Sequence, residues 1–270
     1  MKMRVLAALV LIPVLLAIVF VAPPVFLAIA VGIVCAIGAF ELLKGTGFVQ
    51  HTRLIIYTMV MAFAVPVCCY FGMQNVYALL GIFLFTLLLF GEVICSHGAI
   101  PCEKLGICFV GGLLIPYFLS TLVRLMGDGS TRWIILIPFV LAYMADTGAY
   151  FIGCAFGKHK LAPTISPKKS VEGLVGGVTT AILGMMLYCF IMQNAVHANV
   201  NYGYAVIYGF VGALAGTFGD LSFSAIKRQA GIKDYGNLIP GHGGVLDRFD
   251  SVIVVAPLTE LLLALLPVME

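Results

Sequence analysis

Charged side chains are scarce in this chain: only 10% of its 270 residues are Asp, Glu, Lys or Arg, and there is a single Trp. Soluble domains carry about 25% charged and about 45–50% apolar residues. Here 62% of the residues are hydrophobic and the mean hydropathy is +1.11. A water-soluble globular protein is therefore excluded, and the long apolar runs exclude a disordered chain as well.

The motifs of several soluble enzyme classes are also missing. The sequence has no Walker A motif, no GxSxG elbow, no HExxH motif and no CxxC pair or Cys/His metal spacing. Most of the eight Cys lie in or beside apolar runs, where a thiol behaves as a small hydrophobic group, so we expect them to be structural. Chemistry must therefore come from the helices and the loops between them.

Long apolar runs divide the chain into about nine segments that suit a bilayer, since a spanning helix needs about 20 apolar residues. These segments are residues 5–22, 24–40, 54–71, 76–95, 105–123, 133–156, 173–192, 204–226 and 251–267. The first lacks an A-x-A cleavage site and is expected to stay as a helix rather than be removed as a signal peptide. The sequence predicts an all-α polytopic membrane protein, with about four N-terminal spans in residues 1–104 and the others in residues 105–270.

The basic residues predict the orientation of these spans. With a cytoplasmic N-terminus, 13 of the 15 Lys and Arg fall on the cytoplasmic side, and only Arg124 and Arg132 do not. This asymmetry follows the positive-inside rule. Two cytoplasmic loops, residues 157–172 and 227–250, hold eight of the 13 cations and are expected to carry the active site. The expected location is the inner (cytoplasmic) membrane, with the active site facing the cytoplasm.

Acidic residues inside apolar spans are costly and often functional. Four are present within the predicted spans: Glu92, Asp146, Asp220 and Glu260. Glu92 is close enough to a helix end to reach the surface, and Glu260 suits a hydrogen bond to a neighbouring helix. Asp220 is followed by Ser224 and Lys227 at i+4 and i+7, so these three side chains share one helix face. They suit an ion or a phosphate held between them, although an internal ion pair is the simpler alternative.

The loop at 227–250 gathers groups that suit phosphate and metal binding. Its cations are Lys227, Arg228, Lys233 and Arg248. Gly243 and Gly244 permit tight turns whose N–H groups face an anion, and the adjacent His242 is a further phosphate contact. Asp247 and Asp250 supply hard oxygen ligands for magnesium, which binds proteins through one or two carboxylates together with substrate phosphates. A merely solvated charged loop is the alternative.

The loop at 157–172 has a similar character. Lys168, Lys169 and Ser170 stand directly before the next predicted helix, whose N-terminus attracts phosphate. Ser170 is also placed to cap that helix. A basic loop that only fixes the topology is the alternative for this segment.

The segment Ser224–Asp250 resembles the signature of the phosphatidate cytidylyltransferase (CDP-diacylglycerol synthase) family over 27 residues. The pattern runs Ser224-x-Ile226-Lys227-Arg228, Lys233-Asp234-x-Gly236 and Leu238-x-Pro240-x-His242-Gly243-Gly244-Val245-x-Asp247-Arg248-Phe249-Asp250. Asp146–Tyr150 and Ile165–Gly173 are also similar to that family, whereas the first hundred residues match only in being hydrophobic.

This resemblance implies a nine-helix, magnesium-dependent membrane enzyme that transfers CMP from CTP to phosphatidate, and a homodimer. Asp220 and Asp247 fall at the family's metal-binding positions, with Lys227 nearby on the phosphates as a third catalytic residue. Substrate and phosphate contacts are expected from Lys168, Lys169, Ser170, Ser224, Arg228, Lys233, His242, Gly243, Gly244 and Arg248. Supporting acids are Asp146, Asp234 and Asp250. Whether a second cation accompanies magnesium stays open.

Two other functions compete with this hypothesis. A CTP-dependent lipid kinase of the dolichol-kinase type would transfer the γ-phosphate to an alcohol and would need a base. A transporter of an anionic solute would be expected to have its site near the bilayer midplane, whereas the candidate groups in this chain gather at one membrane face. No nucleic-acid partner is expected.

Overall fold

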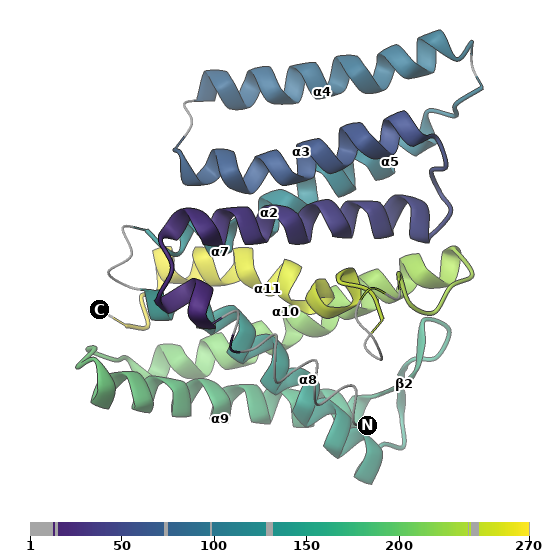
Figure 1. The fold of residues 1–270 in the computed structure, drawn as a ribbon. Helices are drawn as coiled ribbons and strands as arrows, with labels where there is room; N and C mark the ends of the chain where they lie inside the picture. The colour runs from purple at the N-terminus through teal and green to yellow at the C-terminus, as the bar shows by residue number, and fades with distance from the viewer. Residues whose placement is uncertain are drawn as a thin grey trace. The chain divides into compact units, whose positions relative to one another are not determined.

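The structure, a computed structural model, describes residues 13, 16–72, 75–97, 99–127, 132–236, 238 and 243–269. Helices dominate it (Figure 1). The chain divides into two compact units. The first unit comprises Met1–Arg132 and Gln229–Arg248, and the second comprises Trp133–Arg228 and Phe249–Glu270. The predicted division after residue 104 falls within the first unit and stays a prediction.

Seven helical stretches of the described residues are long and apolar enough to cross a membrane. They are Pro24–Gly45, Thr52–Tyr70, Val76–Cys95, Glu103–Arg124, Arg132–Phe156, Val171–Ala195 and Tyr202–Gln229. Their ends agree with the predicted spans between residues 24 and 226 to within five residues. This confirms an all-α polytopic membrane protein, while the total of nine spans stays a prediction.

Two predicted spans are not among the seven. The span at 5–22 lies mostly outside the described residues, of which 16–20 are helical. The last one corresponds to α11 (Leu246–Leu265), whose N-terminal part is polar because it contains Asp247, Arg248 and Asp250. The helix therefore begins about one turn ahead of the predicted apolar stretch at 251–267.

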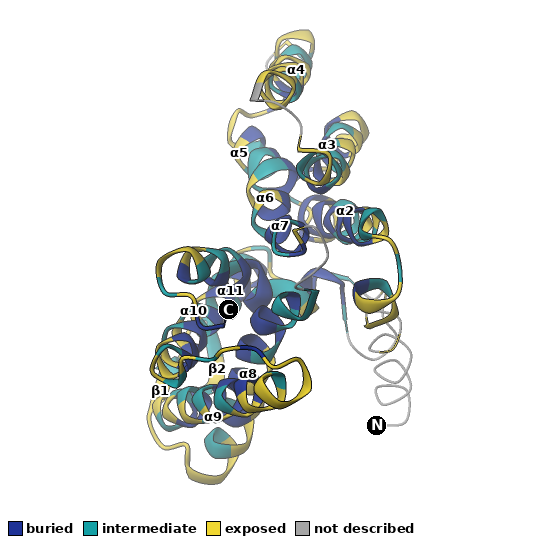
Figure 2. Cartoon of the chain, turned by 90° about the vertical axis from the view of Figure 1, so that its left-hand side faces the viewer, coloured by how far each residue is buried: buried dark blue, intermediate teal, exposed yellow. Residues whose placement is uncertain are grey.

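In the first unit, α2 (Pro24–Phe40), α3 (Thr52–Tyr70) and α4 (Asn75–Cys95) follow one another as antiparallel neighbours (Figure 1). The helices α5 (Glu103–Phe109), α6 (Ile115–Leu119) and α7 (Thr121–Arg124) form one interrupted stretch that packs against α3. Its π-helical turn η2 (Val110–Leu114) contains Gly112, where a Cβ would lie 2.8 Å from the Phe85 ring. Most of α4 is exposed (Figure 2), as suits a helix that faces lipid.

A second π-helical turn, η1 (Glu41–Gly45), continues α2 beyond Phe40. The Thr46 hydroxyl donates to the Leu42 carbonyl at 2.5 Å and so closes the end of this stretch. The turn brings a buried acid, Glu41, to the boundary of the apolar segment. This acid contacts the loop that precedes α11, as described below.

In the second unit, α8 (Leu136–Phe156) and α9 (Val171–Ala195) form an antiparallel pair, and α10 (Tyr202–Gln229) packs on both. Glycines allow the close approach of α9 to α8, since a Cβ on Gly177 would lie 2.8 Å from the Ala145 carbonyl oxygen. Small residues at helix contacts are usual in membrane proteins. Gly219 of α10 is packed in the same way against the Asp250 backbone of α11.

The connection between α8 and α9, predicted as a loop at 157–172, contains a short antiparallel hairpin. Its strands are β1 (Lys160–Ala162) and β2 (Ser166–Ser170), with Lys160 opposite Ser170 (β2 is labelled in Figure 1). Ser170 ends the hairpin and caps α9, because its hydroxyl accepts the Gly173 N–H at 3.1 Å. The predicted capping role of Ser170 is confirmed.

Candidate active site

A cavity of about 660 Å³ opens in the second unit between α8, the hairpin and the facing parts of α9 and α10. Five of the predicted site residues line it: Asp146, Lys168, Lys169, Ser170 and Asp220. Lys160 adds a third cation, and Tyr150, Leu161 and Leu174 supply an apolar part of the wall. The cavity therefore combines a cationic side with a surface that suits an apolar group.

An ion pair joins the two charged sides of this cavity. The Lys169 ammonium lies 2.5 Å from the Asp220 Oδ2, and both side chains are about one quarter exposed. The Ser224 hydroxyl donates to the other Asp220 oxygen at 3.1 Å, which confirms that these two residues share one face of α10. Lys169 was predicted to bind phosphate, and its pairing with Asp220 could not be predicted, because residues 51 positions apart meet only in the folded chain.

Three carboxylates of the second unit interact electrostatically. Asp250 is at the start of α11, ahead of the apolar stretch. Burial raises its pKa to about 7, and the Asp220 and Asp146 carboxylates add to the effect while the Lys227 ammonium opposes it. Ser251 donates to Asp146 at 3.3 Å. Because neighbouring negative charges disfavour one another, this cluster favours a bound cation.

The donor chemistry of these residues fits magnesium, which prefers oxygen ligands and keeps several positions for water and substrate phosphates. Among the described residues, no group of three or more His, Cys, Asp and Glu side chains is arranged to hold a metal ion by itself. Two carboxylates are enough when a triphosphate supplies the remaining oxygens. The residues present are therefore compatible with a metal that binds together with its nucleotide.

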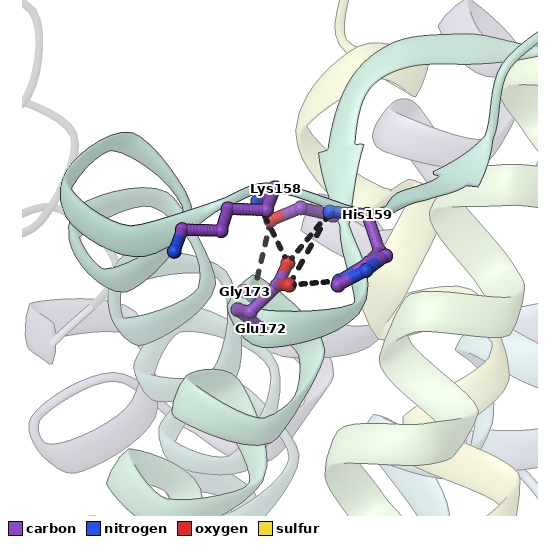
Figure 3. A network of polar contacts seen from close by, with 5 residues as sticks. Lys158, His159, Glu172 and Gly173 are labelled. Carbon is purple, nitrogen blue, oxygen red and sulfur yellow. Dashed lines mark hydrogen bonds and ion pairs between the residues drawn. The ribbon is translucent and has the colours of Figure 1, made fainter.

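The hairpin is fixed at its base by Glu172 in the first turn of α9 (Figure 3). This carboxylate accepts the backbone N–H groups of Lys158 at 3.0 Å and of His159 at 3.2 Å. The His159 Nδ1 lies 2.6 Å from the same carboxylate, while the Lys158 ammonium points away from it (Figure 3). Glu172 therefore holds the segment that carries Lys168 and Lys169, a role that sequence analysis did not assign to it.

Two predicted phosphate contacts on α10 differ in their surroundings. Lys227 is only 8% exposed, and its charge acts on Asp250. The Arg228 guanidinium donates to the Ile165 carbonyl at 3.1 Å, so it ties the end of α10 to the hairpin turn. Arg228 therefore has a structural contact in addition to the predicted phosphate contact.

The remaining predicted residues belong to the first unit. Lys233, Asp234 and Arg248 are exposed, whereas Asp247 is 8% exposed. His242 lies outside the described residues, as do its neighbours at 239–241. Gly243 adopts a left-handed conformation with φ of +83°, which agrees with the tight turn expected at this glycine.

The Asp247 carboxylate closes the loop that precedes α11. Its Oδ2 accepts the N–H groups of Tyr235 at 2.8 Å and of Gly244 at 3.0 Å. The predicted metal ligand therefore also organises its own loop. The Tyr235 amide could not be assigned to it from spacing, because Tyr235 lies 12 residues away, whereas Gly244 is only three residues away.

Glu41 is the acid that sequence analysis missed. It is 4% exposed, and its two carboxylate oxygens accept the N–H groups of Val245 at 2.9 Å and Leu246 at 2.8 Å. It was not predicted as an intramembrane acid because it directly follows the predicted span at 24–40. Its position at the end of an apolar run, without a charged partner nearby in sequence other than Lys44, was the available signal.

Comparison with known proteins gives consistent similarities. The model of the cytidylyltransferase family matches residues 2–266. The phosphatidate cytidylyltransferase of Haemophilus influenzae is 31% identical over 280 residues, which cover 95% of this chain and 96% of the relative. The phosphatidate cytidylyltransferases of Staphylococcus epidermidis and Staphylococcus aureus are 44% and 41% identical over 129 residues, which cover 48% of this chain and 48% of each relative.

Proposed function

This chain belongs to the cytidylyltransferase family, and from this membership we propose that it is a phosphatidate cytidylyltransferase. It transfers CMP from CTP to phosphatidate, giving CDP-diacylglycerol and pyrophosphate. The observation that carries the proposal is the similarity to a phosphatidate cytidylyltransferase over nearly the whole of both chains. The cavity with its paired Lys169 and Asp220 offers a site whose charges suit this chemistry.

The reaction poses an electrostatic problem rather than a proton-transfer problem. A phosphate oxygen of phosphatidate attacks the α-phosphorus of CTP, and the bond from that phosphorus to the bridging oxygen of pyrophosphate breaks. The attacking oxygen is already anionic near neutral pH, so no strong general base is required. The enzyme must instead bring two anions together and stabilise the charge on the leaving pyrophosphate.

Lys168, Lys169 and Ser170 are placed to bind these phosphates at the hairpin. The ion pair joins Lys169 and Asp220 at the cavity surface, where both are partly exposed. An incoming phosphate competes with the carboxylate for the Lys169 ammonium. Asp220 then becomes available as a ligand while Ser224 keeps it oriented through its hydrogen bond.

We further propose that Asp220 and Asp247 are magnesium ligands, with Lys227 next to the phosphates. Magnesium bound there would neutralise phosphate charge at the reacting phosphorus. Arg228, Lys233, His242, Gly243, Gly244 and Arg248 are the remaining proposed phosphate contacts, and Asp146, Asp234 and Asp250 are the proposed supporting acids. A second cation beside magnesium is part of the same proposal.

The protein is a membrane protein, and three finer features are proposals. The basic loops are expected on the cytoplasmic side of a bacterial inner membrane, because the positive-inside rule favours that side. The acyl chains of phosphatidate then remain in the bilayer while its phosphate reaches the cavity from the interface. A homodimer is expected from the family resemblance.

The direct test uses detergent-purified protein with CTP, phosphatidate and magnesium. We expect pyrophosphate and a lipid of the mass of CDP-diacylglycerol to appear in equal amounts. Omitting phosphatidate should stop both, and replacing CTP with ATP should give neither. Nucleotide hydrolysis without a cytidylyl lipid, in a folded preparation, would contradict the proposal.

A further inference from the structure

The first turn of α11 is capped by a residue that lies more than 200 positions away. The first N–H groups of a helix have no partner within the helix and need an acceptor from elsewhere. One Glu41 oxygen accepts the N–H of Val245, the residue before α11, and the other accepts the N–H of Leu246, the first residue of the helix. A carboxylate also suits the positive end of the helix dipole. Glu41 therefore fixes the residue that directly precedes Asp247.

The surrounding glycines are fitted to this carboxylate. A Cβ on Gly236 would lie 2.7 Å from a Glu41 carboxylate oxygen, and one on Gly244 would lie 2.6 Å from the other. A Cβ on Gly45, one turn beyond Glu41, would collide with the Tyr235 carbonyl. Residues 235–236 and 244 thus pack closely against η1. A side chain larger than glycine at position 45, 236 or 244 would collide with Glu41 or with the Tyr235 carbonyl.

The same segments hold Asp247. Its Oδ2 accepts the N–H of Tyr235, which precedes Gly236, and the N–H of Gly244 itself. Both carboxylates are more than nine-tenths buried. Any shift of the segment at 244–246 away from Glu41 would therefore move Asp247 together with the Gly244 amide, one of the two amides that orient its carboxylate.

We propose that Glu41 is a positioning residue for the transfer reaction: it anchors the first turn of α11 and the adjacent residues 236 and 244, so that the Asp247 carboxylate is held for its ligand. This inference rests on the proposed function of Asp247. It extends the active site to η1, the turn that follows α2.

The test compares Glu41→Gln with Glu103→Gln, which makes the same chemical change at an exposed position at the start of α5. Glutamine keeps the length of the side chain but has only one acceptor oxygen, so either the Val245 or the Leu246 amide loses its partner. Two measurements are made on full-length protein in detergent: the rate of CMP transfer, and the rate of tryptic cleavage after Lys233, an exposed residue that precedes the loop at 235–244.

We expect Glu41→Gln to lower CMP transfer about 10- to 100-fold, as for other residues that orient a ligand. Cleavage after Lys233 should become at least about tenfold faster, because a lost charge-assisted hydrogen bond increases local opening. Cleavage after Lys158 in the hairpin should not change, and Glu103→Gln should leave both measurements at the wild-type level. Unchanged cleavage after Lys233, or faster cleavage with full transfer activity, would overturn the proposal.

Glu41→Asp separates positioning from a general loss of folding. Aspartate keeps the charge and both acceptor oxygens on a shorter side chain, so we expect transfer at least about threefold above that of Glu41→Gln. If Glu41→Asp is no better than Glu41→Gln, the two acceptor oxygens are not what matters, and the proposal is wrong. Absence of transfer by the wild type would instead refute the proposed function, while the cleavage assay would still report on the anchor.

Discussion

The Lys169 ammonium lies in the candidate cavity, 2.5 Å from the Asp220 carboxylate. If Lys169 binds a substrate phosphate, Lys169→Gln removes a charge that stabilises the reacting phosphates. We expect the rate of CMP transfer to fall by about 100-fold or more, the usual effect of removing one such group. The measurement is the initial rate at saturating CTP and phosphatidate in detergent.

Lys158→Gln is the matched control for this change. Lys158 is exposed near the same hairpin, but its ammonium points away from Glu172 and its backbone N–H makes the structural contact (Figure 3). We expect its transfer rate to stay within about twofold of wild type, as for most surface substitutions. Equal losses in both variants would mean that the hairpin cations serve topology rather than chemistry.

Asp247→Asn tests the predicted metal ligand. Asparagine preserves the size of the side chain and one acceptor oxygen for the loop amides, but it removes the negative charge that a cation needs. We expect transfer to fall at least about 100-fold while the protein still inserts into the membrane and elutes as a folded species. Near-normal turnover at low magnesium concentration would rule out the metal role.

Contacts of single residues could be predicted from the sequence where the two partners are close together in the chain. Ser170 caps the helix that follows it, and Asp220 and Ser224 share a helix face, because spacing alone determines both. Glu41 was missed because its partners at 245–246 come from the far end of the chain. The predicted roles of the site residues in binding phosphate or metal stay predictions.

At the scale of elements, close packing of α8 and α9 depends on glycine. Gly177→Ala would place a Cβ 2.8 Å from the Ala145 carbonyl oxygen and 3.2 Å from the Ala149 Cβ. Overpacking of this kind costs about 1–3 kcal/mol, which exceeds the gain of about 1 kcal/mol that alanine brings to a helix. We expect a lower unfolding temperature, measured in one detergent.

Gly91→Ala provides the comparison, because a Cβ at Gly91 in α4 meets no atom within 4 Å. There the helix propensity of alanine acts alone, so the unfolding temperature should stay the same or rise. If both substitutions destabilise the protein equally, the packing of α8 against α9 is not the cause.

The helices themselves could be predicted from the sequence, because a bilayer requires long apolar runs and these runs are visible without a structure. The hairpin at 160–170 could not. Its second strand, Ser166–Ser170, contains proline and two lysines, which are depleted in strands. Pairing with β1 and the capping of α9 by Ser170 stabilise it instead.

At the scale of the whole molecule, α9 connects the hairpin to the segment at 196–201, so these two segments should lie on opposite sides of the membrane. We expect Lys158→Cys to react with a membrane-impermeant maleimide only in inside-out vesicles, and His197→Cys only from outside intact cells. Exposed native cysteines, such as Cys154, are replaced by serine beforehand. Labelling of both positions from one side, or the reverse pattern, would refute the predicted orientation.

The measurement that tests the central claim most directly follows each phosphate of CTP. Purified protein receives magnesium, phosphatidate, a lipid alcohol as a second acceptor, and CTP labelled at either the α- or the γ-phosphate. A phosphatidate cytidylyltransferase moves the α label into the lipid fraction and releases the γ label as pyrophosphate. Transfer of the γ label to the lipid alcohol, with the α label left on free nucleotide, would mean a lipid kinase and would contradict the proposed transfer of CMP to phosphatidate.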